Sequence, residues 1–215
     1  MNLQSKRRLA RVEVVLFPAF VLWFIWQLQF TARWTWLLFV VWLAASFVAY
    51  RDNAKTLGWR TDNLRLATRQ ALIVFGPFAA GLIVIALILR APWSLPPGSV
   101  FWPRLFGYFA FCVVQQVALN SLIHNRMLLA LGNEWIAATL TGIVFAACHW
   151  PNPVLMPLTL IGGAAMAWMF GRVRNILPLA IGQTVLGLMV SWAFPMAWHH
   201  HLRVGPGYYT WPVIR

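Results

Sequence analysis

The chain has 215 residues, of which 61% are hydrophobic and only 10% are charged, and its formal net charge at pH 7 is +13. An ordinary soluble domain carries about 25% charged residues, and one of this size has no core large enough to bury so much apolar surface. The composition therefore excludes a soluble globular domain. The 17 lysines and arginines lie in short blocks between apolar runs, which is typical of membrane topology signals and argues against nucleic-acid binding.

The apolar runs predict an all-α, polytopic transmembrane bundle of about seven spans, because a helix needs about 20 mostly apolar residues to cross a bilayer. We expect one membrane domain, residues 1–215. The first run is long and lacks a small-residue cleavage site, so we interpret it as an uncleaved helix. The fifth and sixth runs are separated by a short Pro-rich link and should form a tight antiparallel pair. The predicted spans are residues 14–30, 34–50, 71–89, 105–123, 136–150, 154–170 and 176–194.

The positions of the cations predict the orientation, because cytoplasmic connections carry the excess of Lys and Arg. With the N-terminus inside, the cytoplasmic cations are Lys6, Arg7, Arg8, Arg11, Arg51, Lys55, Arg60, Arg65, Arg69, Arg126, Arg172 and Arg174. The outer side then keeps Arg33, Arg90, Arg104, Arg203 and Arg215. We therefore expect an N-in/C-out protein of the bacterial cytoplasmic membrane. The basic connection 51–69 is expected to contact anionic headgroups.

Polar residues follow one face of the fourth predicted span. Gln116, Asn120 and His124 recur every four residues, which places them on one helical stripe, and Cys112 extends the stripe by a turn. Polar groups at membrane depth are costly, so each needs a partner or a function. Hydrogen bonding between helices is the simplest explanation for any one of them.

The fifth and seventh predicted spans also carry polar or small faces. These faces comprise Thr139, Gly142, Ala146 and His149 on the fifth span, and Gln183, Gly187 and Ser191 on the seventh. We expect the three faces to look inward, so that any site lies where the fourth, fifth and seventh spans meet.

Three segments resemble, in order and spacing, the motifs of the CPBP family, which comprises type II CAAX prenyl endopeptidases, lysostaphin-resistance-protein-like membrane proteins and bacteriocin-processing or immunity proteins. The first motif is a Glu-Glu pair followed after three residues by Arg, the second is Phe, three residues and His, and the third is His with Asn four residues later. The aligned residues here are Gln115, Gln116 and Asn120, then Phe145 and His149, then Gln183 and Gly187. The resemblance covers residues 105–191, the family's core.

The resemblance implies an intramembrane endopeptidase whose catalytic positions are Gln115, Gln116, Asn120, His149 and Gln183. Water activation requires a group that accepts a proton, and the amide of Gln has no useful basicity. The four carboxylates, Glu13, Asp52, Asp62 and Glu134, all fall outside the middle of the predicted spans. We therefore expect a degenerate catalytic site.

Neither a cofactor nor a metal is predicted. A zinc site needs three protein ligands, and Cys112 with His149 offers only two. The run His199, His200 and His201 follows the last predicted span, and we interpret it as a solvated polar turn.

The leading hypothesis is a CPBP-like membrane pseudoenzyme that acts as a binding or accessory subunit. One alternative is an active endopeptidase of the CAAX-processing type that uses His149 with Gln115 and Gln116. Another is a small transporter lined by the polar stripe, which the lack of an embedded charge and of an inverted repeat disfavours. The expected partners are membrane lipids and either another membrane protein or a lipidated or transmembrane peptide.

Overall fold

The computed structural model describes residues 2–92 and 98–210, and throughout these ranges the chain is helical, without strands. Five segments are long and apolar enough to cross a membrane: Leu3–Thr31, Arg33–Tyr50, Leu64–Ile88, Gly98–Leu131 and Ile176–Ala193. The expected all-α class is therefore confirmed for the described residues, which include five helical segments that could cross a membrane. Arg215, expected on the outer side, lies outside the described residues.

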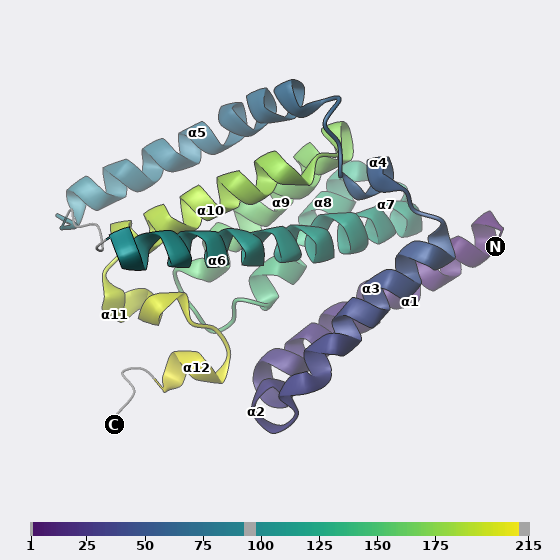
Figure 1. Ribbon diagram of the computed structural model, residues 1–215, viewed down its shortest axis with the longest axis horizontal. Helices are drawn as coiled ribbons and strands as arrows, with labels where there is room; N and C mark the ends of the chain where they lie inside the picture. The colour runs from purple at the N-terminus through teal and green to yellow at the C-terminus, as the bar shows by residue number, and fades with distance from the viewer. Residues whose placement is uncertain (1, 93–97, 211–215) are drawn as a thin grey trace.

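Most of the elements run along one common direction (Figure 1). In chain order they are α1 (Leu3–Trp23), η1 (Phe24–Leu28), α2 (Gln29–Thr31), η2 (Arg33–Thr35), α3 (Trp36–Tyr50), α4 (Ala54–Leu57), α5 (Leu64–Ile88), α6 (Gly98–Gln116), η3 (Val117–His124), α7 (Asn125–Leu131), α8 (Glu134–Ala147), α9 (Leu155–Val173), α10 (Ile176–Ala193), α11 (Met196–His199), η4 (His200–Leu202) and α12 (Pro206–Tyr209). Helix α10 packs between α5 and α6, and α1 and α3 form an oblique hairpin that joins the bundle at α7 and η3.

Helices α8 and α9 form the tight antiparallel pair that the short link predicts. A Cβ atom added to Gly142 would collide with the carbonyl oxygen of Leu160 and with Ala164, so the two backbones are in direct contact. With 14 residues, α8 extends only about 21 Å, less than the roughly 30 Å of a hydrocarbon core. Helix α9 has 19 residues but includes Gly162, Gly163 and Arg172 in its sequence. The fifth and sixth predicted spans are therefore not among the five long apolar segments.

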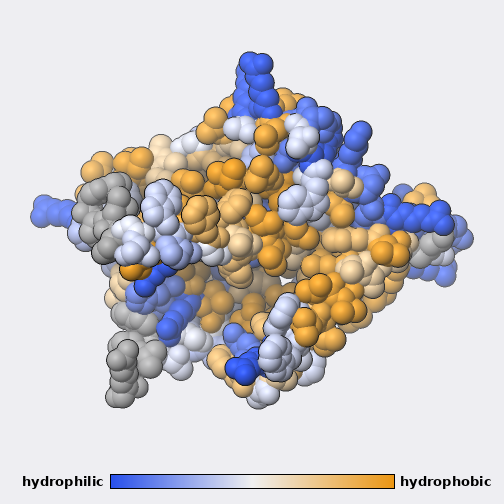
Figure 2. All heavy atoms as spheres, in the orientation of Figure 1, coloured by the Kyte–Doolittle hydropathy of each residue, from blue (hydrophilic) through white to orange (hydrophobic). Residues whose placement is uncertain are grey.

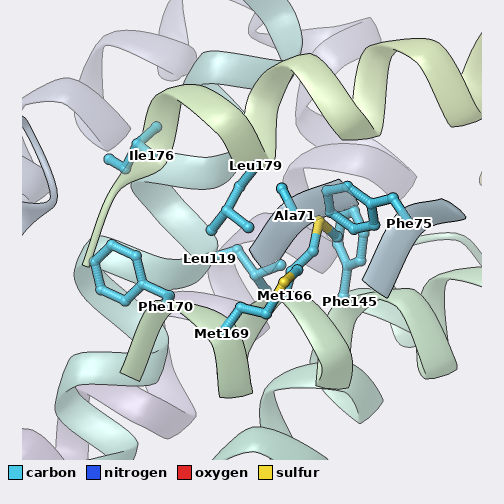
Figure 3. Packing of buried hydrophobic residues seen from close by; sticks show 9 residues of the cluster. All are labelled: Ala71, Phe75, Leu119, Phe145, Met166, Met169, Phe170, Ile176 and Leu179. Atoms are coloured by element: carbon cyan, nitrogen blue, oxygen red, sulfur yellow. The ribbon is translucent and has the colours of Figure 1, made fainter. Parts of the chain in front are cut away.

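The apolar core lies where α5, η3, α8, α9 and α10 meet. Figure 3 shows nine side chains of this core converging from these elements, namely Ala71, Phe75, Leu119, Phe145, Met166, Met169, Phe170, Ile176 and Leu179. Phe75 packs so closely on α10 that a Cβ atom at Gly182 would overlap its ring. The core holds together the helices that carry the predicted site residues.

The connections expected in the cytoplasm meet at one end of the bundle. The side-chain amide of Asn125 donates to the carbonyl of Thr56 at 3.0 Å, and Arg174 donates to Asn125 Oδ1 at 3.1 Å. The amide of Asn175 donates to the carbonyl of Arg60 at 2.8 Å. Residues 51–63, α7 and the connection between α9 and α10 are thus bound to one another, so these connections lie on the same side of the bundle.

The connections expected on the outer side meet at the other end. The side-chain amide of Asn152 donates to the carbonyls of His199 and Arg203 at 2.9 and 3.0 Å. The backbone N–H of Gly205 donates to Trp150 at 2.8 Å, and the indole of Trp192 donates to Pro92 at 3.1 Å. The C-terminal segment is therefore folded back over the link between α8 and α9.

The surface agrees with a lipid environment along the helices. Figure 2 shows a face that is mostly hydrophobic, with strongly hydrophilic side chains gathered toward its margins, above all at the end that holds the N-terminus in Figure 1. Each of the long apolar segments carries large hydrophobic side chains that are exposed. Such surface is stable in hydrocarbon and costly in water.

A buried charge cluster was not expected, but Arg126 and Glu13 are 2% and 6% exposed and lie within the protein, near the end of the bundle where the basic connections meet. Helix α1 begins at Leu3, not near residue 14, and this places Glu13 inside a span. The Arg126 guanidinium lies 3.3 Å from Glu13 and 2.6 Å from Asp52, donates to Ser46 at 3.0 Å, and sits 3.6 Å above the ring centre of Tyr50. We call these five residues the arginine cluster. It joins the hairpin of α1 and α3 to α7.

The interpretation of His199, His200 and His201 as a solvated turn is wrong for His199, which is 0% exposed. Its Nε2 lies 3.2 Å from the carbonyl of Phe194, and its Nδ1 accepts the backbone N–H of Leu202 at 3.2 Å. His200 stacks on Tyr208 with ring centres 4.1 Å apart, whereas His201 is exposed. The fold of the C-terminal segment creates this burial, and composition carries no signal of it.

Replacing Arg126 with Met should lower the free energy of unfolding by about 3–5 kcal/mol, because Glu13 and Asp52 then stay buried without a cation. The control is Arg172→Met, which removes a largely exposed pair with Glu134 at 3.9 Å and should cost less than about 1 kcal/mol. Unfolding titrations in mixed detergent micelles measure both. Equal losses in the two variants would contradict a buried charge cluster.

Stability should fall as the pH falls through the range in which His199 becomes protonated. Burial lowers the pKa of His199 below its ordinary value of about 6.5, and the neighbouring His201 and His200 act in the same direction. Because the folded state favours the neutral ring, His199 contributes stability above about pH 6.5 and loses it at lower pH. Melting temperatures between pH 7.5 and 5 should fall less in His199→Gln than in the wild type. His201→Gln removes one of the groups that lower the pKa of His199, so its slope should lie between those of the wild type and His199→Gln. An unchanged slope in His199→Gln would refute the assignment.

Candidate functional site

A cavity of about 480 Å³ lies among α5, α6, α8, α9 and α10. Its described wall is mostly apolar, and the polar side chains among these lining residues are Tyr108, Gln115, His149, Thr159 and Gln183. This volume and mixture are those of small-molecule sites, in which a few polar groups orient a ligand within apolar walls. The cavity is therefore the candidate site.

The cavity opens toward the lipid-facing side of the bundle. Pro77 and Gly81 of α5 and Phe111 of α6 line it and are exposed, and they belong to the middle of two membrane-spanning segments. Helices α5 and α6 lie on either side of α10 (Figure 1). The cavity is therefore bordered by exposed residues of α5 and α6, on the apolar surface of the bundle.

The predicted site residues divide into two groups. Gln115, His149 and Gln183 line the cavity together with Gly187, so residues from the fourth, fifth and seventh predicted spans do meet there. Gln116 and Asn120 are each 0% exposed and lie behind the wall. On the fifth predicted span Thr139 is exposed, and Thr141 is buried in its place, donating to the carbonyl of Ala137 at 2.7 Å.

Four side-chain amides connect the buried stripe to the cavity. Asn120 donates to Gln116 at 2.5 Å, Gln116 donates to Gln183 at 2.6 Å, and Gln183 donates to Gln115 at 2.6 Å. We call this chain the amide relay. Gln116 also donates to the sulfur of Met166 at 3.0 Å, so the relay joins α6, η3, α9 and α10. These amides satisfy most of one another's hydrogen-bonding needs where water is excluded.

The relay coincides with a change in helix type. The helix that begins as α6 becomes π-helical over Val117–His124 before continuing as α7. A π-helical turn holds an extra residue, and such turns are frequent at functional sites. Asn120, Ser121, Leu122, Ile123 and His124 are all buried in consequence, so that both Asn120 and His124 face protein. His124 Nδ1 lies 3.5 Å from the hydroxyl of Thr141.

His149 is held by its own helix end. Its Nδ1 lies 2.6 Å from the carbonyl of Phe145, and its ring meets the Phe145 ring edge to face at 4.7 Å. A carbonyl oxygen only accepts, so Nδ1 carries the proton. Desolvation favours the uncharged imidazole, which leaves Nε2 as an acceptor.

Sequence reasoning missed Tyr108 and Met166. A Cβ atom at Gly187 would overlap the Tyr108 hydroxyl, so Tyr108 fills the space beside α10 at the position where the resemblance expects an Asn side chain. Tyr108 precedes Cys112 by four residues and continues the predicted stripe, so its spacing was an available signal. For Met166 the sequence offered no signal, because a methionine that accepts a hydrogen bond has the same sequence pattern as a methionine that only packs in the core.

The site has hydrogen-bonding groups but no strong base. None of the described cavity-lining residues is a carboxylate. Among the residues that the structure describes, no three His, Cys, Asp or Glu side chains are grouped to hold a metal ion. No protein-family model, curated protein or solved structure matches the chain.

Removing the middle amide should test whether the relay acts as one unit. In Gln183→Leu the Gln116 N–H₂ and the Gln115 carbonyl lose their partners, so the free energy of unfolding should fall by about 1–2 kcal/mol. The exposed-site control Gln29→Leu should cost much less. The double variant Gln116→Leu/Gln183→Leu should cost less than the sum of the single variants, as measured by the same unfolding titration. Strict additivity would contradict the relay.

Proposed function

We propose that this integral membrane protein is a CPBP-like pseudoenzyme, whose cavity binds a membrane-borne ligand or peptide without hydrolysing it. One observation carries the proposal: the residues aligned with the family's acid and second imidazole are Gln115, Gln116 and Gln183, and all three are used in the amide relay. An amide engaged in this way orients a ligand but takes no proton from water.

The proposed topology is seven spans, N-in/C-out, in a bacterial cytoplasmic membrane. The α8 and α9 pair adds two spans to the five long apolar segments. Because the pair crosses the membrane and returns to the same side, α10 keeps the orientation that it would have without the pair. The gathering of the basic connections at one end of the bundle supports the proposed inner side, because an excess of Lys and Arg marks the cytoplasm.

The proposed role is that of a binding or accessory subunit. The apolar wall and the lipid-facing opening suit a membrane lipid, a lipidated peptide or one helix of another membrane protein. The polar groups of the wall are neutral, so they select hydrogen-bonding partners, not ions.

Active proteolysis is the second candidate, because His149, Gln115 and Gln183 line one cavity. In that reaction His149 Nε2 would accept the proton of water while the glutamines orient it. His149 would then act without a carboxylate partner, since its Nδ1 hydrogen bond goes to the carbonyl of Phe145. The third hypothesis, a transporter lined by the stripe, is weaker, because Gln116, Asn120 and His124 lie behind the cavity wall and line no path.

The deciding experiment incubates the protein in nanodiscs with photoreactive prenylated and transmembrane peptides. We expect cross-linking to cavity residues and no cleavage products by mass spectrometry. Gly81→Phe, which fills the cavity from α5, should abolish the cross-links. Gly76→Phe is the matched control, since this glycine lies on the same helix outside the cavity and also faces open space.

Cleavage that disappears in His149→Ala would overturn the pseudoenzyme proposal in favour of the endopeptidase. Cross-linking that is equal in Gly81→Phe and Gly76→Phe would overturn the assignment of the cavity as the binding site.

A further inference from the structure

The amide relay has a fixed direction. The sulfur of Met166 carries no hydrogen, so the Gln116 atom that faces it must be the N–H₂ group. That choice makes Gln116 donate to Gln183, and Gln183 in turn donates to Gln115. The carbonyl of Gln115 is thereby occupied, and its N–H₂ group is the end of the relay that remains to face the cavity.

The opposite end of the relay is a buried acceptor. Asn120 Oδ1 is shielded from solvent and has no hydrogen-bond partner. Every side-chain amide in the relay is therefore polarised in the same sense, from Asn120 toward Gln115. Hydrogen bonds in series strengthen the N–H donor at the end of the series. The cavity wall thus presents a reinforced donor at Gln115.

His149 supplies the complementary group. Because Nδ1 donates to the carbonyl of Phe145, the neutral ring offers Nε2 as an acceptor, and His149 lines the same cavity. None of the described lining residues is charged at neutral pH. A charged headgroup would lose its hydration here without gaining a counter-ion, whereas an uncharged group that both accepts and donates would be satisfied.

We propose that the cavity binds an uncharged single-chain lipid whose head carries a carbonyl beside a hydroxyl or N–H group, as in a monoacylglycerol or a fatty acyl amide. The carbonyl accepts from Gln115, the hydroxyl or N–H donates to His149, and the acyl chain lies along the apolar wall of α5 and α10. Such a lipid would enter from the bilayer beside the exposed lining residues of α5 and α6. This inference rests on the proposed function, since it assigns the ligand of the same cavity.

The test uses four lipids that differ in one feature each. Monopalmitoylglycerol has both groups, methyl palmitate lacks the donor, hexadecyl glyceryl ether lacks the carbonyl, and lysophosphatidylcholine adds charge. Binding to the protein in nanodiscs is measured by native mass spectrometry and by competition with a photoreactive monoacylglycerol. We expect monopalmitoylglycerol to bind about tenfold more tightly than each of the other three, because each loses one hydrogen bond or adds an uncompensated charge.

Two variants test which protein side chain binds the carbonyl of the lipid and which binds its hydroxyl or N–H group. Gln115→Glu replaces the terminal donor with an acceptor, and it should remove the preference for monopalmitoylglycerol over the ether. His149→Phe keeps an aromatic ring without an acceptor, and it should remove the preference over methyl palmitate. Gly81→Phe should abolish the binding of all four lipids, and Gly76→Phe should leave it unchanged.

Equal binding of all four lipids that is still abolished by Gly81→Phe would overturn this inference and leave the proposed binding function standing. Tightest binding of lysophosphatidylcholine would overturn it as well. Failure of every lipid and every peptide to bind in a manner sensitive to Gly81→Phe would overturn the proposed function itself.

Discussion

Inside a bilayer no water pairs with a buried polar group, so each such group must find its partner within the chain. This protein meets the constraint twice, in two different ways. Near one end of the bundle the arginine cluster compensates charge with charge, as Arg126 lies between Glu13 and Asp52. At the cavity, the neutral amides of the relay pair with one another through hydrogen bonds. Each arrangement joins helices far apart in the sequence, so the tertiary structure follows from the pairing.

The arginine cluster and the amide relay differ in which polar groups they leave available to a ligand. In the arginine cluster the carboxylates, the Ser46 hydroxyl and the Tyr50 ring all surround one guanidinium, and none of these residues lines the cavity. The amide relay ends at Gln115 on the cavity wall and keeps one donor group there. A structural role explains the first arrangement fully. The second ends at a buried, unpartnered Asn120 Oδ1 on one side and at Gln115 on the cavity wall on the other, and the proposed binding site lies at Gln115.

Part of this organisation was predictable from spacing alone. The burial of Cys112, Gln116, Asn120 and His124 follows from their recurrence every four residues, and the contact between α8 and α9 follows from the short link. The relay was not predictable, because the choice of Gln183 as partner depends on how α10 packs against α6. Glu13 was misplaced because an apolar run marks the middle of a helix and not its first turns. His199 was misjudged because its burial is created by a C-terminal segment that folds back on Asn152.

The amide side chains of the relay depend on one another through their hydrogen bonds. Gln116 must accept from Asn120 and donate to Gln183 at the same time, and an ionised carboxylate at that position could only accept. A charged side chain in place of Asn120 would likewise lack a counter-charge beside an amide. The relay amides therefore form one coupled set of neutral groups. Such a set offers no base for hydrolysis, and it avoids the desolvation cost of buried charges. The result is a wall suited to an uncharged ligand held by hydrogen bonds.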